Sequence, residues 1–72
     1  MNNLMAKIYE TVLPEMAEHG IEDTTSNRIA VLSGLWDAWN EDDTHSVEKS
    51  MYMTALAFEI LHLQLKKIHS TK

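Results

Sequence analysis

The stretch MYMTALAFEILHLQL, residues 51–65, decides the fold, because eleven of its fifteen residues are apolar. A helix with apolar residues on all sides is typically buried on more than one face. The stretch is too short and too polar to cross a bilayer, since it contains Glu59 and His62. The sequence therefore predicts a long helix from about residue 46 to residue 69, at the centre of a helical unit.

This predicted helix has two separate apolar faces. The first follows spacings of four and three residues, which is a heptad pattern over three repeats: Val47, Met51, Thr54, Phe58, Leu61, Leu65 and Ile68. The second consists of Met53, Leu56, Ile60 and Leu63. Residues 58 and 60 project about 200° apart, so one face can hold the subunit together while the other joins subunits. The pattern does not decide between them, and we assign the oligomer interface to the second face.

Two further helices are predicted before the long one. The first spans about residues 3–19, with a kink or a break at Pro14 and a left-handed cap at Gly20. Its apolar stripe is Met5, Ile8, Val12 and Met16. The second spans about residues 26–40, with a stripe formed by Ile29, Leu32, Trp36 and Trp39. Gly34 lies in the middle of this helix, where it marks either a close helix–helix approach, which we expect, or a weak point of the helix.

The fold class is therefore all-α: a single domain, residues 1–72, built as a small three-helix unit. A core this small is marginal without a disulfide, a metal or oligomerisation, and the chain has no cysteine. We therefore expect a homodimer that completes a helical bundle. The alternative is a monomer in which the first two helices cover both sides of the third.

Charge is distributed unevenly along the chain. Residues 1–46 contain nine acidic residues against Lys7 and Arg28, whereas residues 47–72 carry a small positive excess. The acidic part disfavours direct nucleic-acid binding and suits a basic protein partner or simple solubility. The N-terminal residues do not read as a secretory signal, and with no cysteine a cytoplasmic location, away from membranes, is expected.

The predicted partner site combines Trp36 and Trp39 with the acidic run Glu41, Asp42 and Asp43. Tryptophan anchors often dominate protein interfaces, and acidic neighbours would orient a basic partner. The alternative is that both tryptophans pack in the core.

No catalytic residues, metal or cofactor are predicted. There is no cysteine nucleophile, no Gly-x-Ser-x-Gly turn and no glycine-rich phosphate loop. One alternative is a half-ferritin-like metal site in which Glu59 and His62, three residues apart, join a glutamate of the first helix: Glu10, Glu15 or Glu18. Another is a helical oligomer that sequesters a nucleotide or other small ligand between aromatic residues, including Tyr9 and Tyr52.

The sequence thus predicts a small, acidic, non-enzymatic interaction protein. It would act as a homo-oligomer and would bind and modulate, by inhibition, a larger macromolecular partner. In size and composition the chain resembles accessory regulators carried by phages and plasmids, and this resemblance implies a viral accessory inhibitor.

Overall fold

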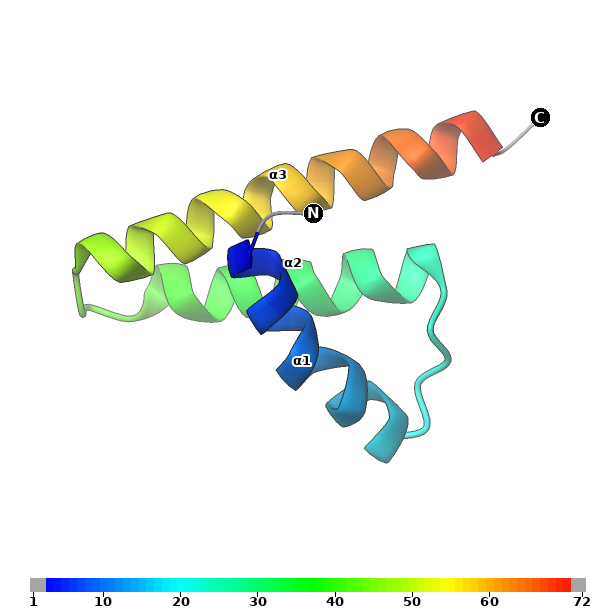
Figure 1. The fold of residues 1–72 in the computed structure, drawn as a ribbon, viewed down its shortest axis with the longest axis horizontal. Helices are drawn as coiled ribbons and strands as arrows, with labels where there is room; N and C mark the ends of the chain where they lie inside the picture. Colours follow the sequence, from blue (N-terminus) through cyan, green and yellow to red (C-terminus); the bar gives the residue numbers. More distant parts are fainter. Residues whose placement is uncertain (1–2, 71–72) are drawn as a thin grey trace.

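The computed structural model describes residues 3–70, which form three helices joined by two short loops (Figure 1). The helices are α1 (Asn3–Glu18), α2 (Thr25–Glu41) and α3 (Val47–Ser70). The described residues contain no strand, and the all-α prediction is confirmed. Each predicted helix boundary agrees with the structure to within one residue.

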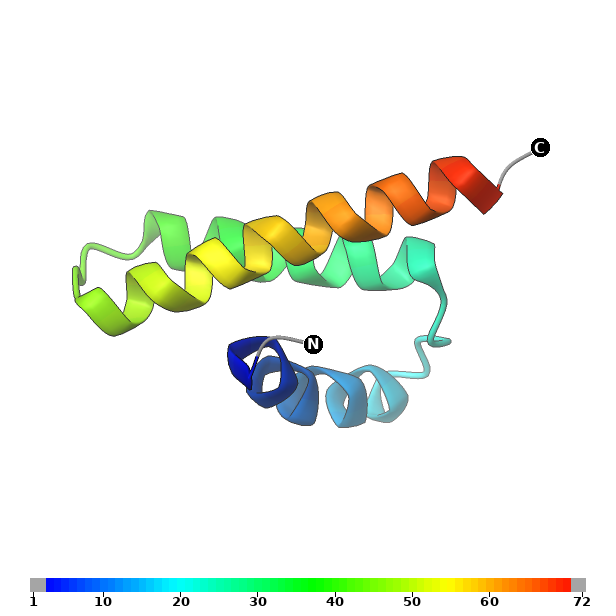
Figure 2. The ribbon, with the colours of Figure 1, turned by 45° about the horizontal axis from the view of Figure 1, so that its top comes forward.

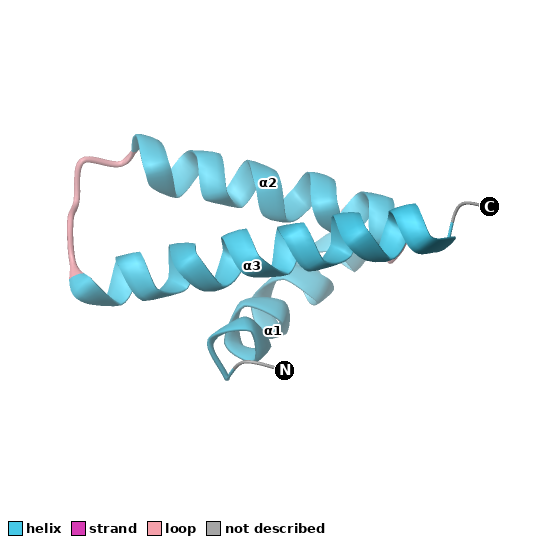
Figure 3. Ribbon diagram, turned by 90° about the horizontal axis from the view of Figure 1, so that it is seen from above, coloured by secondary structure: helices cyan, strands magenta, loops and turns pink. Residues whose placement is uncertain are grey.

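Helices α2 and α3 form an antiparallel hairpin, and α1 crosses α3 on the same side as α2 (Figures 1 and 2). Both α1 and α2 pack mainly on α3 and only weakly on each other. When the molecule is seen from above, no other helix lies in front of α3 (Figure 3). The third helix is therefore central to the core but covered on one side only.

All three helices contribute to the core, and most of its buried residues come from α1 and α3. Leu32 of α2 and Leu56 of α3 are completely buried. The predicted stripe of α1 is confirmed and is joined by Tyr9. Within residues 3–70 the buried residues are Met5, Ile8, Tyr9, Val12, Met16, Leu32, Ala55, Leu56 and Leu63.

Helix α1 continues through Pro14 without a break, so no second short helix begins there. Proline leaves the carbonyl of Glu10 without its helical donor, but Pro14 and Glu10 are both exposed. The helix ends as predicted at Gly20, whose φ is 71°. The amide of Ile21 donates to the Met16 carbonyl at 2.8 Å and that of Gly20 to the Ala17 carbonyl at 3.1 Å, the pattern of a Schellman cap.

Side-chain caps fix where α2 and α3 begin. The hydroxyl oxygen of Thr24 accepts the Asn27 amide at 3.1 Å, and that of Ser46 accepts the Lys49 amide at 3.0 Å.

The expectation for Gly34 is wrong. It is exposed, and a Cβ placed on it would meet nothing within 4 Å, so no close approach explains this glycine.

Candidate interaction surface

The most conspicuous surface of the molecule is an apolar face of α3 that faces solvent. Its exposure ranges from about half of each side chain to 79% of Val47 and 69% of Phe58. We call this the outer face, and its apolar members are Val47, Met51, Phe58, Leu61, Leu65 and Ile68. Such an extended apolar surface on a small chain is typical of an interaction site.

The structure buries two of the four residues predicted to form the oligomer interface. Leu56 is 0% exposed and Leu63 is 4% exposed, and both belong to the core of the subunit. Met53 and Ile60 are partly buried, and Ile60 packs against that core. A second chain cannot reach Leu56 and Leu63 without displacing α1 and α2, whereas Met53 lines the groove beside Phe58 on the outer face.

Two shallow grooves flank Phe58 on the outer face. One, of about 660 Å³, lies between α3 and the start of α1, and its lining includes Leu4, Met51 and Phe58. The other, of about 380 Å³, lies between α3 and α2, and its lining includes Trp36, Phe58 and Leu61. Between Phe58 and Met51, Thr54 is smaller and polar, and its hydroxyl donates to the Ser50 carbonyl at 2.9 Å. Ridges and hollows on this face can therefore receive side chains from another helix.

Trp36 and Trp39 are neither fully buried nor fully exposed. Both are partly buried and pack against the core, and the Trp39 ring meets Tyr52 edge-on with centroids 6.1 Å apart. Trp36 also lines the groove beside Phe58. Trp36 therefore adjoins the outer face, whereas Trp39 braces the α2–α3 hairpin.

The acidic run Glu41, Asp42 and Asp43 is exposed at the end of α2 and in the turn that leads to α3. Lys49 orders this turn, since its ammonium donates to the Asp42 carbonyl at 2.8 Å and to the Thr44 carbonyl at 2.7 Å. The Asp42 carboxylate lies 3.6 Å from the same ammonium. Within residues 3–70 neither Glu41 nor Asp43 forms an ion pair, so both contribute negative charge at this end of the molecule.

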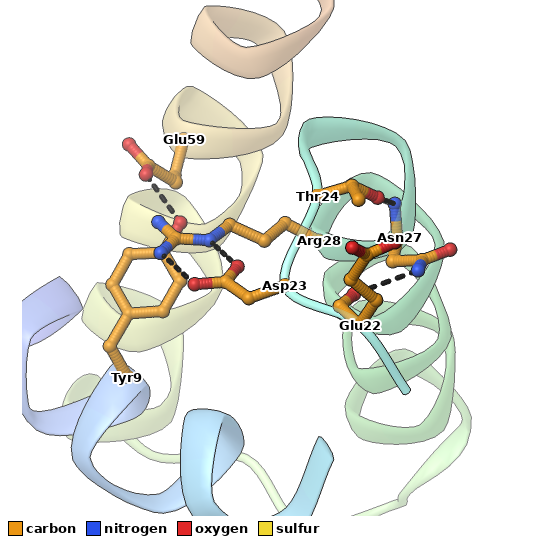
Figure 4. Close-up of polar contacts among 7 residues, drawn as sticks. All are labelled: Tyr9, Glu22, Asp23, Thr24, Asn27, Arg28 and Glu59. Carbon is orange, nitrogen blue, oxygen red and sulfur yellow. Dashed lines mark hydrogen bonds and ion pairs between the residues drawn. The ribbon is translucent and has the colours of Figure 1, made fainter. Parts of the chain in front are cut away.

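A polar cluster between the helices was not predicted. The buried Tyr9 donates its hydroxyl to the Glu59 carboxylate at 2.5 Å, and the Arg28 guanidinium lies over the Tyr9 ring, 4.8 Å from its centroid (Figure 4). Arg28 in turn donates to both carboxylate oxygens of Asp23, at 2.5 and 2.8 Å. The sequence offered one clue: Tyr9 directly follows Ile8 at the edge of the apolar stripe of α1.

This cluster shifts the pKa values of its members. Burial, followed by the hydrogen bond to Glu59, raises the pKa of Tyr9 from 10.0 to about 12. The hydrogen bonds from Arg28 hold the pKa of Asp23 below its ordinary value, and the same pair raises the pKa of Arg28. The arrangement keeps Tyr9 neutral and both ion-pair members charged, which is the chemistry of a structural tie between helices.

The structure does not assemble the alternative metal site. Among the described residues, no group of three or more His, Asp and Glu side chains is placed to hold a metal ion. Glu59 accepts the Tyr9 hydroxyl, while His62 is exposed.

The aromatic residues proposed for a small ligand are brought together only in part. Trp39 and Tyr52 line a groove of about 380 Å³ between α1 and the α2–α3 hairpin, and Lys7 and Glu15 are also in its lining. Tyr9 points instead toward Glu59 (Figure 4).

Comparisons of the chain with protein-family models, with curated proteins and with solved structures found no match. Within residues 3–70, no helix is both long and apolar enough to cross a membrane. A functional proposal for this chain therefore rests on its surface chemistry.

Proposed function

We propose that this protein is a small, non-enzymatic interaction protein that acts as a homo-oligomer and inhibits a larger partner with a basic surface. The observation that carries the proposal is the outer face of α3, where six large apolar side chains are exposed. Burying side chains of this kind is worth about 1.5–3 kcal/mol each relative to full exposure, so their exposure favours association. The cytoplasm is the proposed compartment, and a phage- or plasmid-type accessory role is the proposed setting.

The two surfaces of the molecule suit different tasks. The outer face is apolar along the whole of α3, as an interface between subunits commonly is. The turn that carries Glu41 and Asp43 is polar and acidic, so it suits a charged, reversible contact with another protein. Glu41 and Asp43 precede the first residue of α3, so they lie outside the apolar face that self-association would bury.

Self-association is tested by light scattering at tens of micromolar. Wild-type protein should have about twice the chain mass of 8.3 kDa. Phe58→Glu, which places a charge in the middle of the outer face, should give the monomer mass with helical circular dichroism retained. Ala30→Glu adds the same charge at an exposed site on α2 and should stay dimeric. A monomeric wild type would refute the proposal that the protein acts as an oligomer.

Partner binding is tested by affinity capture, in which wild-type protein is compared with a variant whose turn has lost the charges of Glu41 and Asp43. The double variant Glu41→Gln with Asp43→Gln should lose a partner that the wild type retains, and the wild-type complex should weaken as salt rises. The matched control is Glu10→Gln with Glu18→Gln, which removes two exposed acids from α1. Equal capture by both double variants, or no capture by the wild type, would contradict the proposed role of the turn.

A further inference from the structure

The outer face is shaped for a single helix that runs along its whole length. Its positions, with Thr54 included, recur at alternating intervals of four and three residues from Val47 to Ile68. Because their mean spacing is 3.5 residues, the side chains of the outer face stay on one side of α3, and a single partner helix can contact all of them. The alternation of four and three residues is the same when α3 is read in either direction. A second copy of α3 can therefore pack on the outer face in a parallel or an antiparallel orientation.

Charge distinguishes the two orientations. The end of the molecule where α3 begins carries Glu41, Asp42, Asp43 and Glu48 against Lys49, whereas the other end of α3 carries Lys66, Lys67 and His69. These ends lie about 30 Å apart along the helix, which is several screening lengths at physiological salt. Only charges that face each other across an interface therefore matter. An antiparallel pair places each acidic end beside a basic end, whereas a parallel pair places like charges together.

Side-chain size favours the same orientation. In a parallel pair every position of the outer face meets its own copy, so the two Phe58 rings share one layer and the two Thr54 side chains share another. An antiparallel pair centred on Phe58 also brings the two Phe58 rings together, but it offsets Thr54, which then faces the partner's Leu61 and Leu65. Large side chains opposite small ones fill the space between helices better than layers that are all large or all small. The grooves on either side of Phe58 provide the space for such interdigitation.

The available area is adequate for a dimer. Six exposed side chains at roughly 100 Å² each present on the order of 600 Å² per subunit. A standard stable interface buries about 800 Å² per partner, and Trp36 and Leu4 lie at the edges of the same surface.

We propose that two copies of this chain pair their α3 helices antiparallel through the outer face, with Phe58 close to the two-fold axis. This inference rests on the proposed self-association and adds its orientation. The two acidic turns then lie at opposite ends of the assembly, so one dimer presents two separate copies of the proposed partner site.

Thiol crosslinking tests the orientation directly, because the chain contains no cysteine of its own. The variants Met51→Cys and Leu65→Cys each place one thiol on the outer face. The two positions are fourteen residues apart, about 21 Å along α3, which a short bismaleimide cannot span. Each variant is treated alone and after equimolar mixing, unfolding and refolding, and mass spectrometry distinguishes mixed from identical pairs. Ala30→Cys, on the exposed side of α2, is the control.

The antiparallel pair predicts that mixing Met51→Cys with Leu65→Cys gives a mixed crosslinked dimer at about ten times the yield of either variant alone, since proximity sets the effective thiol concentration. Crosslinking of each variant with itself, and no mixed product, would show a parallel pair and overturn the inference while leaving self-association intact. A dimer by mass that gives no crosslinked product, with either variant alone or with the mixture, would overturn the use of the outer face. A wild type that is monomeric by light scattering would instead overturn self-association itself, and the orientation with it.

Discussion

Tyr9 is the residue through which all three helices are tied by polar contacts. It lies on α1, its hydroxyl reaches Glu59 on α3, and its ring is covered by Arg28 of α2. A neutral hydroxyl donating to a carboxylate in a partly buried site is among the stronger hydrogen bonds available to a protein.

Tyr9→Phe should lower the free energy of unfolding by about 1–2 kcal/mol, because Glu59 would keep its charge but lose its donor. The loss should depend on pH. The folded-state pKa of Tyr9, about 12, lies above its ordinary value of 10.0, so the unfolded chain releases this proton first as pH rises. The contribution is therefore complete below pH 10 and is lost as pH rises from 10 to 12. Urea unfolding of both proteins across this range measures it, and an equal alkaline decline in wild type and variant would contradict the assignment to Tyr9.

Gly34 offers the opposite kind of prediction. It lies in the interior of α2, is exposed and has open space where a Cβ would be. Gly34→Ala should therefore raise the free energy of unfolding by about 0.5–1 kcal/mol, measured by urea titration. Gly20→Ala is the contrasting variant: there too nothing crowds a Cβ, but the φ of 71° strains alanine, so stability should fall. A destabilised Gly34→Ala protein would mean that α2 makes a contact absent from this fold.

At the scale of the element, the boundaries of the helices follow from local chemistry. Thr24 and Ser46 cap the starts of α2 and α3, and Gly20 ends α1, so short-range rules were sufficient to place them. Short-range rules could not predict which face of α3 packs in the core and which faces solvent. Both faces are apolar, and only the packing of α1 and α2 decides which one is covered. Glu59 is an example, because its hydrogen-bond donor, Tyr9, lies fifty positions earlier in the sequence on a different helix.

The two faces of α3 should respond differently to the same substitution. Leu63→Glu places a charge in a site that is 4% exposed, at a cost of several kcal/mol, which is a large part of the stability expected for a chain of this size. Leu61→Glu changes a half-exposed side chain and should alter the stability of the isolated subunit by no more than about 0.5 kcal/mol. Circular dichroism should show an unfolded Leu63→Glu protein and a helical Leu61→Glu protein with a reduced mass by light scattering. Two folded variants, or two unfolded ones, would contradict this assignment of the faces.

At the scale of the whole molecule, the sequence anticipated the exposed acidic turn but not its relation to the tryptophans. Trp36 and Trp39 were grouped with Glu41 and Asp43 because they are close in the chain. In the fold Trp39 packs on Tyr52, and Trp36 borders the outer face instead. Sequence spacing places Trp36 and Trp39 on the same side of α2. It does not show which residues of α3 pack against each of them.

A dimer formed through the outer face should make thermal stability depend on protein concentration. Mass action stabilises the folded subunit whenever folding and association are linked, so the Tm should rise by several degrees over a hundredfold increase in concentration. Phe58→Glu should remove this dependence and leave one lower Tm at every concentration. Calorimetry over that range measures both. A wild-type Tm that does not move with concentration would contradict linked association.

The packing of α1 mainly on α3 also affects how the chain folds as it leaves the ribosome. The stripe of α1, from Met5 to Met16, is translated first, yet the residues that cover it, among them Leu56 and Leu63, are translated some forty residues later. A nascent chain that has reached only the end of α2 still lacks α3, the helix on which α1 mainly packs. Folding should therefore begin only after most of α3 has emerged, and until then the emerging α1 is a natural binding site for chaperones.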